Sequence, residues 1–277
     1  MRKACAFLLS ILILFWAVSA KASPYGTSAW ANVQIDEESN GQMDEHEASA
    51  SIMSNYNYAE AKAGAWLYHL KGFGYADISE EAVADGYGES EFWDTYTVIA
   101  PEGVESVRIG MRIKLNGILQ GGGYGNDYDM WDTGFDVYVY LNGEIPLYEA
   151  YAGLSQNDFY AYSSSGNLDT EDFTPVMDGY ELSDFTDVIY FWVEPGEFWI
   201  NYSLYAGACI GDSWEGVPGT GWAISDFYYS ANFEIFPADS NIISLDSESG
   251  QGVVPIPSTL LLLGSGLIGI LATRKNK

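Results

Sequence analysis

Alternating apolar and polar positions recur in several segments of the chain. In residues 107–115 every odd position is apolar, and the even positions are Arg108, Gly110, Arg112 and Lys114. Because successive side chains of a strand point to opposite faces, this period of two predicts a strand with one buried and one solvated face. The same alternation predicts strands over 135–141, 198–206 and 227–235.

Turn signals separate these predicted strands. They are Asn142-Gly143, Pro195-Gly196 and Pro218-Gly219, dipeptides typical of tight turns. Only residues 78–84 hint at a short helix, and a loop is equally compatible with them. No linker interrupts residues 25–240. We therefore expect an all-β, jelly-roll-like antiparallel β-sandwich over residues 23–240 as a single domain.

The amino-terminal segment has a different pattern. Arg2 and Lys3 precede an apolar run over 4–18, and Ala20-Lys21-Ala22 follows it. This order of basic, apolar and small residues is that of a secretory signal peptide. We expect residues 1–22 to be removed and the body of the chain to be exported.

The carboxyl-terminal segment is also apolar. Residues 253–273 form a run about as long as the roughly 20 residues that a membrane-spanning helix needs. The basic residues that follow it stay on the cytoplasmic side of such a span. Residues 254–277 are thus expected to hold a transmembrane helix with a basic tip in the inner membrane, and 241–253 a last edge strand and a polar spacer.

The motif VPIPSTLLLLGSGLIGILATRKNK resembles the PEP-CTERM sorting signal. The residues that carry the resemblance are Val254, Pro255, Pro257, Ser258, Gly264, Gly266, Arg274 and Lys275. The resemblance implies that an exosortase-type enzyme cuts at the proline motif and releases or transfers the protein to the exterior. Ile256 stands where the family usually has glutamate. The alternative is a plain carboxyl-terminal membrane anchor.

The body also resembles the β-sandwich modules found upstream of such tails. The resemblance rests on residues 92–100, a strand end at Leu115-Asn116-Gly117, and the segments 194–196, 225–227 and 246–250. It implies a fold and an exported location. It implies no catalytic residue.

The charge of the exported body is extreme. Six of the 11 Lys and Arg lie in the two terminal segments, which leaves five against all 39 Asp and Glu and a formal net charge of −34. Nucleic acid is excluded as a partner, because a nucleic-acid binder neutralises phosphates with Lys and Arg. The 16% aromatic content argues for a folded core rather than disorder. We expect the basic residues of 107–115 to be balanced by acidic residues on neighbouring strands.

Catalytic motifs are absent from the sequence. The two histidines, His46 and His69, lie in no zinc-binding motif, and no nucleophile elbow or phosphate loop occurs. Cys209 is the one cysteine outside the signal peptide and has no partner for a disulfide. We therefore predict no catalytic site and no enzyme activity.

Two groups of residues are candidates for binding. Asp127, Asp129 and Asp132 lie in a glycine-rich segment with a spacing that suits calcium, although a solvated acidic turn gives the same pattern. Aromatic residues on the polar phase of the predicted strands are candidates to stack on sugar rings, unless other structure covers them. They are Tyr138, Tyr140, Trp199, Tyr205 and Tyr228.

Two functions fit these features. The preferred hypothesis is an exported non-catalytic surface or extracellular-matrix protein, sorted by its tail and associated with exopolysaccharide. The alternative is a carbohydrate-binding module, with calcium as a candidate cofactor. In both, the protein is held by its carboxyl-terminal helix before processing and is then at the cell surface or extracellular.

Overall fold

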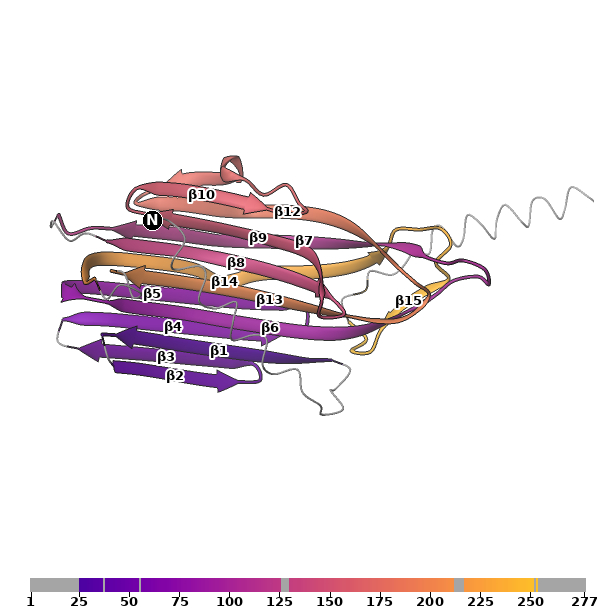
Figure 1. The fold of residues 1–277 in the computed structure, drawn as a ribbon, viewed down its shortest axis with the longest axis horizontal. Helices are drawn as coiled ribbons and strands as arrows, with labels where there is room; N and C mark the ends of the chain where they lie inside the picture. Colours follow the sequence, from indigo (N-terminus) through magenta and orange to yellow (C-terminus); the bar gives the residue numbers. More distant parts are fainter. Residues whose placement is uncertain are drawn as a thin grey trace, which may run out of the picture.

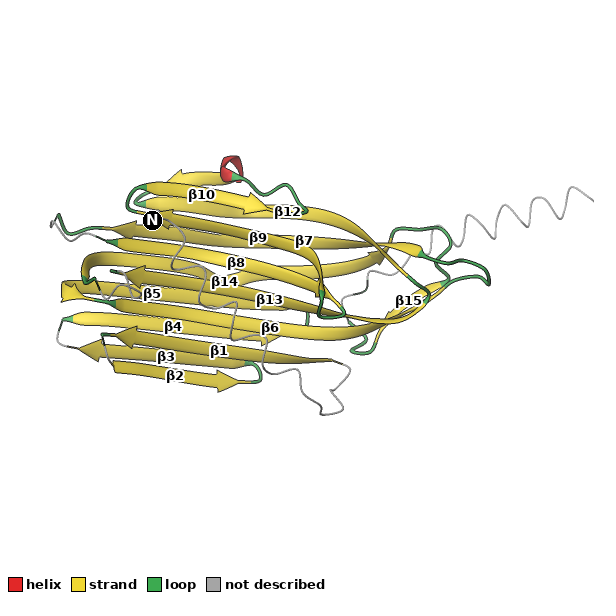
Figure 2. Ribbon diagram, in the orientation of Figure 1, coloured by secondary structure: helices red, strands yellow, loops and turns green. Residues whose placement is uncertain are grey.

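Two antiparallel β-sheets pack face to face in the computed structural model (Figures 1 and 2). The structure describes residues 25–36, 38–54, 56–125, 130–211, 217–251 and 253, without the side chains of 228–230. The predicted signal peptide 1–22 and sorting signal 254–277 lie outside these residues. In the part that is described, no helix is long and apolar enough to cross a membrane. The fold is the predicted all-β sandwich.

Sheet A has the strand order β10-β9-β8-β13-β6-β1-β2, and β15 pairs with β6 beyond the end of β1. Its strands are β1 (Tyr25–Ile35), β2 (Glu38–Asp44), β6 (Ala84–Ile99), β8 (Trp131–Leu141), β9 (Ile145–Ser155), β10 (Asp158–Ser163), β13 (Gly196–Ile210) and β15 (Ser244–Ser247).

Sheet B has the strand order β11-β12-β7-β14-β5-β4-β3. Its strands are β3 (Glu47–Ser54), β4 (Asn57–Trp66), β5 (His69–Ala82), β7 (Val107–Gly122), β11 (Phe173–Val176), β12 (Gly179–Val193) and β14 (Gly219–Pro237). One turn of 3-10 helix, η3 (Thr170–Asp172), precedes β11. Its amino-terminal cap is Asp169, whose side chain accepts from the backbone N–H of Glu171.

Eight strands form the centre of the sandwich. In sheet A they are ordered β6-β13-β8-β9, and in sheet B they are ordered β5-β14-β7-β12. The chain changes sheet at each step from β5 to β8, so that β5 and β7 lie in sheet B and β6 and β8 in sheet A. It changes sheet again from β12 in sheet B to β13 in sheet A, and then to β14 in sheet B. The amino-terminal strands β1 to β4 extend both sheets on one side (Figure 1).

All four strands predicted from alternation are present, within β7, β8, β13 and β14. Two details of the predictions are wrong. The strand at Leu115-Asn116-Gly117 does not end there, because β7 continues to Gly122. Residues 78–84 form no helix: β5 runs to Ala82 and β6 begins at Ala84. Asp36 holds the turn between them, since its side chain accepts from the backbone N–H of Val83.

The core between the sheets has two kinds of packing. Its centre is aromatic, and the rings of Phe92 and Tyr202 stack at 4.0 Å between centroids. Toward the amino-terminal strands it is made of small residues, such as Ala61 and Ala63 of β4. A Cβ atom on Gly88 would overlap the backbone carbonyl of Lys62, so the two sheets approach each other closely there.

A buried carboxylate ties the end of the described body to the sandwich. Asp94 of β6 is fully buried and accepts hydrogen bonds from the Tyr68 hydroxyl and, at 2.5 Å, from the Ser249 hydroxyl. The backbone N–H of Ser249 donates to the same carboxylate at 3.3 Å. Val253 forms a parallel bridge with Ile235. The segment after β14 therefore packs against the body up to the last described residue.

Candidate functional site

Aromatic side chains cover much of the outer face of sheet A. On β8, Val137 and Val139 point into the core and are fully buried, so Tyr138 and Tyr140 point outward. Their rings stack at 6.3 Å between centroids. Alternate residues of β8 thus face the core and the outer surface.

Neighbouring strands extend this aromatic surface in both directions. On one side Tyr151 of β9 lies 5.9 Å from Tyr160 and 5.4 Å from Tyr162 of β10, measured between ring centroids. Tyr160 and Tyr162 are 41% and 48% exposed. The face therefore offers accessible rings rather than only covered ones.

On the other side of β8 the rings continue through β13 and β6 to β1. Tyr205 of β13 lies 5.6 Å from Tyr87 of β6, and Tyr87 lies 5.3 Å from Trp30 of β1. Trp199 is 39% exposed at the start of β13 and lies over Gly143 of the turn after β8. We call the outward-facing residues of β1, β6, β8, β9, β10 and β13 the sheet A face.

The structure brings four of the five predicted aromatic residues to this face: Tyr138, Tyr140, Trp199 and Tyr205. The fifth, Tyr228, belongs to β14 of sheet B, and its side chain lies outside the described residues. Sequence analysis did not select Trp30 and Tyr87. The inward positions of β6 beside Tyr87 are Gly86 and Gly88, which hide the alternation of the strand.

Carboxylates lie among these rings. Glu89 and Glu91 point outward from β6, and Asp136 points outward from β8 opposite Tyr205. Burial, and then the charge of Glu91, raises the pKa of Glu89 to about 7. Burial, and then the charge of Glu149, raises the pKa of Asp136 to about 7. The sheet A face therefore combines aromatic rings with carboxylate hydrogen-bond acceptors.

The predicted calcium residues fall mostly outside the described chain. Asp127 and Asp129 are not described, whereas Asp132 lies on β8 and burial raises its pKa to about 7. Among the described residues, no group of three His, Cys, Asp or Glu is arranged to hold a metal ion. The calcium site of residues 127–132 stays a prediction.

The outer face of sheet B carries the basic residues. Arg112 and Lys114 of β7 both pair with Glu234 of β14, at 2.5 Å and 3.3 Å. These pairs confirm the expected balance for Arg112 and Lys114, whereas Arg108 lies over the ring of Tyr190, 5.0 Å from its centroid. The half-exposed pairs contribute little to stability, about 0–1 kcal/mol each.

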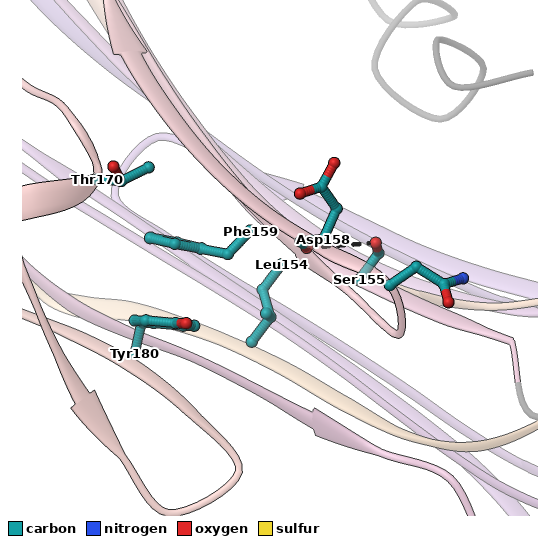
Figure 3. A pocket seen from close by; sticks show the side chains of 7 residues that line it. Leu154, Ser155, Asp158, Phe159, Thr170 and Tyr180 are labelled. Atoms are coloured by element: carbon teal, nitrogen blue, oxygen red, sulfur yellow. Dashed lines mark hydrogen bonds between the residues drawn. The ribbon is translucent and has the colours of Figure 1, made fainter.

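A hollow lies where the edges of the two sheets meet, at the turn between β9 and β10 (Figure 3). The rings of Phe159 and Tyr180 stack there at 3.9 Å between centroids, beside Leu154. Asp158 is the one charged side chain in its lining. The hollow thus offers one small aromatic surface at the edge of the sandwich, whereas the rings of the sheet A face extend over several strands.

No protein-family model, curated protein or solved structure matches the chain. The residues of the sorting motif, from Val254 to Lys275, lie outside the described residues.

Proposed function

We propose that this protein is an exported, non-catalytic glycan-binding β-sandwich of the cell surface or extracellular matrix, and that the sheet A face contacts exopolysaccharide. The observation that carries the proposal is the band of outward-facing rings that runs from β10 to β1. Flat rings pack on the apolar faces of sugars, while their hydroxyls and indole N–H groups form hydrogen bonds at the edge.

The proposed sandwich type is a jelly roll. Its support is the strand order, because two four-stranded sheets with repeated crossings between them are the arrangement of that fold. In this reading β6-β13-β8-β9 and β5-β14-β7-β12 form the jelly roll, and the other strands lengthen its sheets. The sheet A face is then one complete outer surface of the fold.

The proposed route to the exterior is the signal peptide followed by sorting through the PEP-CTERM-like tail. Exosortase-type cleavage near Pro255 and Pro257 is the expected final step. The bridge between Val253 and Ile235 supports a cut that leaves the sandwich intact, since the chain is paired with the body up to that point.

Affinity electrophoresis through exopolysaccharide from the producing cells tests the binding proposal. We expect the body, residues 23–253, to be retarded, and the double variant Tyr138→Ala/Tyr140→Ala to bind about tenfold more weakly. Two stacking contacts of roughly 0.5–1.5 kcal/mol each account for this loss. Tyr190→Ala is the matched control, because Tyr190 is 55% exposed on the outer face of sheet B.

Unchanged migration of the body in the presence of the polysaccharide would contradict glycan binding and leave a purely structural protein. Equal losses for the control and the double variant would move the binding site away from the sheet A face.

The proposal that the protein is not an enzyme has its own test, because Glu89 and Glu91 form a pair of carboxylates beside the rings, and such pairs can hydrolyse glycosides. We expect a defined oligosaccharide to keep its mass after prolonged incubation, and shorter fragments would show hydrolysis.

A further inference from the structure

The two outer faces of the sandwich differ in charge. All five Lys and Arg of the described body lie on strands of sheet B: Lys62 on β4, Lys71 on β5, and Arg108, Arg112 and Lys114 on β7. Lys62 pairs with Glu60 on the same strand at 2.7 Å. Within the described residues, the sheet A face therefore has carboxylates and no basic side chain of its own.

The carboxylates of the sheet A face are close to one another and half-buried. Glu89 lies between Trp30 and Tyr205 on the neighbouring strands, and Glu91 lies beside Ser203. Asp136 lies between Tyr151 and Tyr205. The other titratable groups that face them from the packed strands are Asp85, Tyr87, Asp132, Tyr138 and Glu149. Each of these is an acid, so none supplies a positive charge.

One buried polar atom on the same face has no hydrogen-bond partner among the described residues. The Oδ1 atom of Asn201 is buried and accepts no hydrogen bond from any described residue. Ser203, two residues along β13 and opposite Glu91, is only 8% exposed. Both point outward, because Tyr202 between them is fully buried in the core. Unpaired buried acceptors are costly, and a bound donor would satisfy them.

We propose that the sheet A face selects glycans that carry free primary amines, that is, polymers of amino sugars, over uncharged and acidic glycans. The inference rests on the proposed function and names its ligand class. A protonated amine has three donors and no acceptor, which suits Glu89, Glu91, Asp136 and the Oδ1 atom of Asn201. The rings beside them supply the surface for the sugar and for the cation.

The raised pKa values fit this ligand class. The pKa of Glu89 and of Asp136 is about 7, so each carboxylate is only partly ionised near neutral pH. A cation bound beside them lowers these pKa values, and binding at pH 7 should release protons. The heat of binding should then depend on the ionisation enthalpy of the buffer.

A matched pair of probes separates amine recognition from sugar recognition. The probes are a hexamer of glucosamine and the hexamer of N-acetylglucosamine, which has the same backbone and no charge. Titration calorimetry of the body at pH 7 and low salt should give about 5- to 10-fold tighter binding of the amine form, from two or three partly exposed ion pairs. The difference should shrink in 0.5 M salt, where such pairs are screened.

Variants assign the difference to the sheet A face. Glu89→Gln/Glu91→Gln should remove most of the preference for the amine form, because it should weaken binding of the glucosamine hexamer far more than binding of the acetylated hexamer. Glu60→Gln, the same substitution on the outer face of sheet B, should leave both affinities unchanged. A circular dichroism spectrum identical to that of the unaltered body confirms that each variant is folded.

The outcomes separate this inference from the proposed function. If both hexamers bind equally, or an oligouronate binds more tightly than either, the amine preference is wrong while glycan binding stands. If no oligosaccharide binds and the body also ignores the native exopolysaccharide, both proposals fail. A preference that survives in Glu89→Gln/Glu91→Gln would place amine recognition elsewhere and overturn the assignment.

Discussion

Asp136 is a single residue in which binding and stability oppose each other. It lies half-buried on the outer face of sheet A, and within the described residues no Lys or Arg lies on that sheet to neutralise it. A carboxylate in this position is easier to protonate in the folded chain than in the unfolded chain. The folded state therefore holds a proton over a pH range in which the unfolded state has released it.

The pH dependence of stability follows from this difference. The pKa of Asp136 is about 7 in the folded protein and about 3.9 when unfolded. Because the folded state binds the extra proton between these values, the free energy of unfolding falls as pH rises from about 4 to 7. We expect Asp136→Asn to be more stable than the unaltered body above pH 7, by about 1–2 kcal/mol, and the gain to vanish near pH 4.

Urea unfolding of the two proteins at pH 4 and at pH 8 measures this effect. Asp158→Asn on the exposed edge strand β10 is the control, and it should change stability by less than about 0.5 kcal/mol at both pH values. An Asp136→Asn variant that is less stable than the unaltered body at pH 8 would contradict the raised pKa, because it would mean that the ionised carboxylate stabilises the fold.

At the scale of elements, β6 serves the core, the surface and the contact between the sheets. Its inward residues change from Gly86 and Gly88 at one end to Phe92 and Tyr96 at the other. Small residues let the sheets approach closely, and the aromatic residues fill the wider part of the core. The position of each residue type along β6 therefore sets the local separation of the two sheets.

This packing predicts a large effect of a small substitution. Gly88→Ala should lower the free energy of unfolding by about 2–3 kcal/mol, because the new methyl group overlaps the backbone of β4 rather than a movable side chain. Urea unfolding checks this, with Gly41→Ala on the exposed strand β2 as the control. Equal stability of the two variants would mean that the sheets can separate at Gly88 without loss.

The same strand shows why sequence analysis recovered only part of the fold. The strands β7, β8, β13 and β14 were predicted because their inward residues are large and apolar, as in Ile109, Met111 and Ile113. In β4 and β6 several inward positions are Ala, Gly or Ser. The side chains of these strands alternate between the core and the surface, but their hydrophobicity does not alternate clearly along the sequence. The rings of β8 and β13 were therefore found, whereas Trp30 and Tyr87 were missed.

At the scale of the whole molecule, the body and its proposed tail meet at a fixed point. Ser249 is hydrogen-bonded to the buried carboxylate of Asp94, and Val253 is bridged to Ile235. A cut after this point removes the tail without opening the core. The spacing between the folded body and the proline motif is thus as short as it can be.

The intact mass of the protein from its native producer tests the processing. We expect a membrane-bound form that keeps Arg274 to Lys277 and a released form that begins near residues 21–23 and ends within residues 254–258. Pro255→Ala/Pro257→Ala should abolish the released form, while the folded body is unchanged. If the unaltered protein occurs only with its tail and only in the membrane, it is a tail-anchored surface protein.

The confinement of the five basic residues to sheet B gives the sandwich an electric dipole across its thickness, with sheet A as the negative pole. Close to a negatively charged surface, within the roughly 10 Å over which fields persist at 0.1 M salt, the resulting torque turns sheet B inward. The rings and carboxylates of sheet A then point to the surrounding medium. Because the body as a whole carries a formal net charge of −34 and is repelled by such a surface, this torque favours one orientation without holding the molecule there.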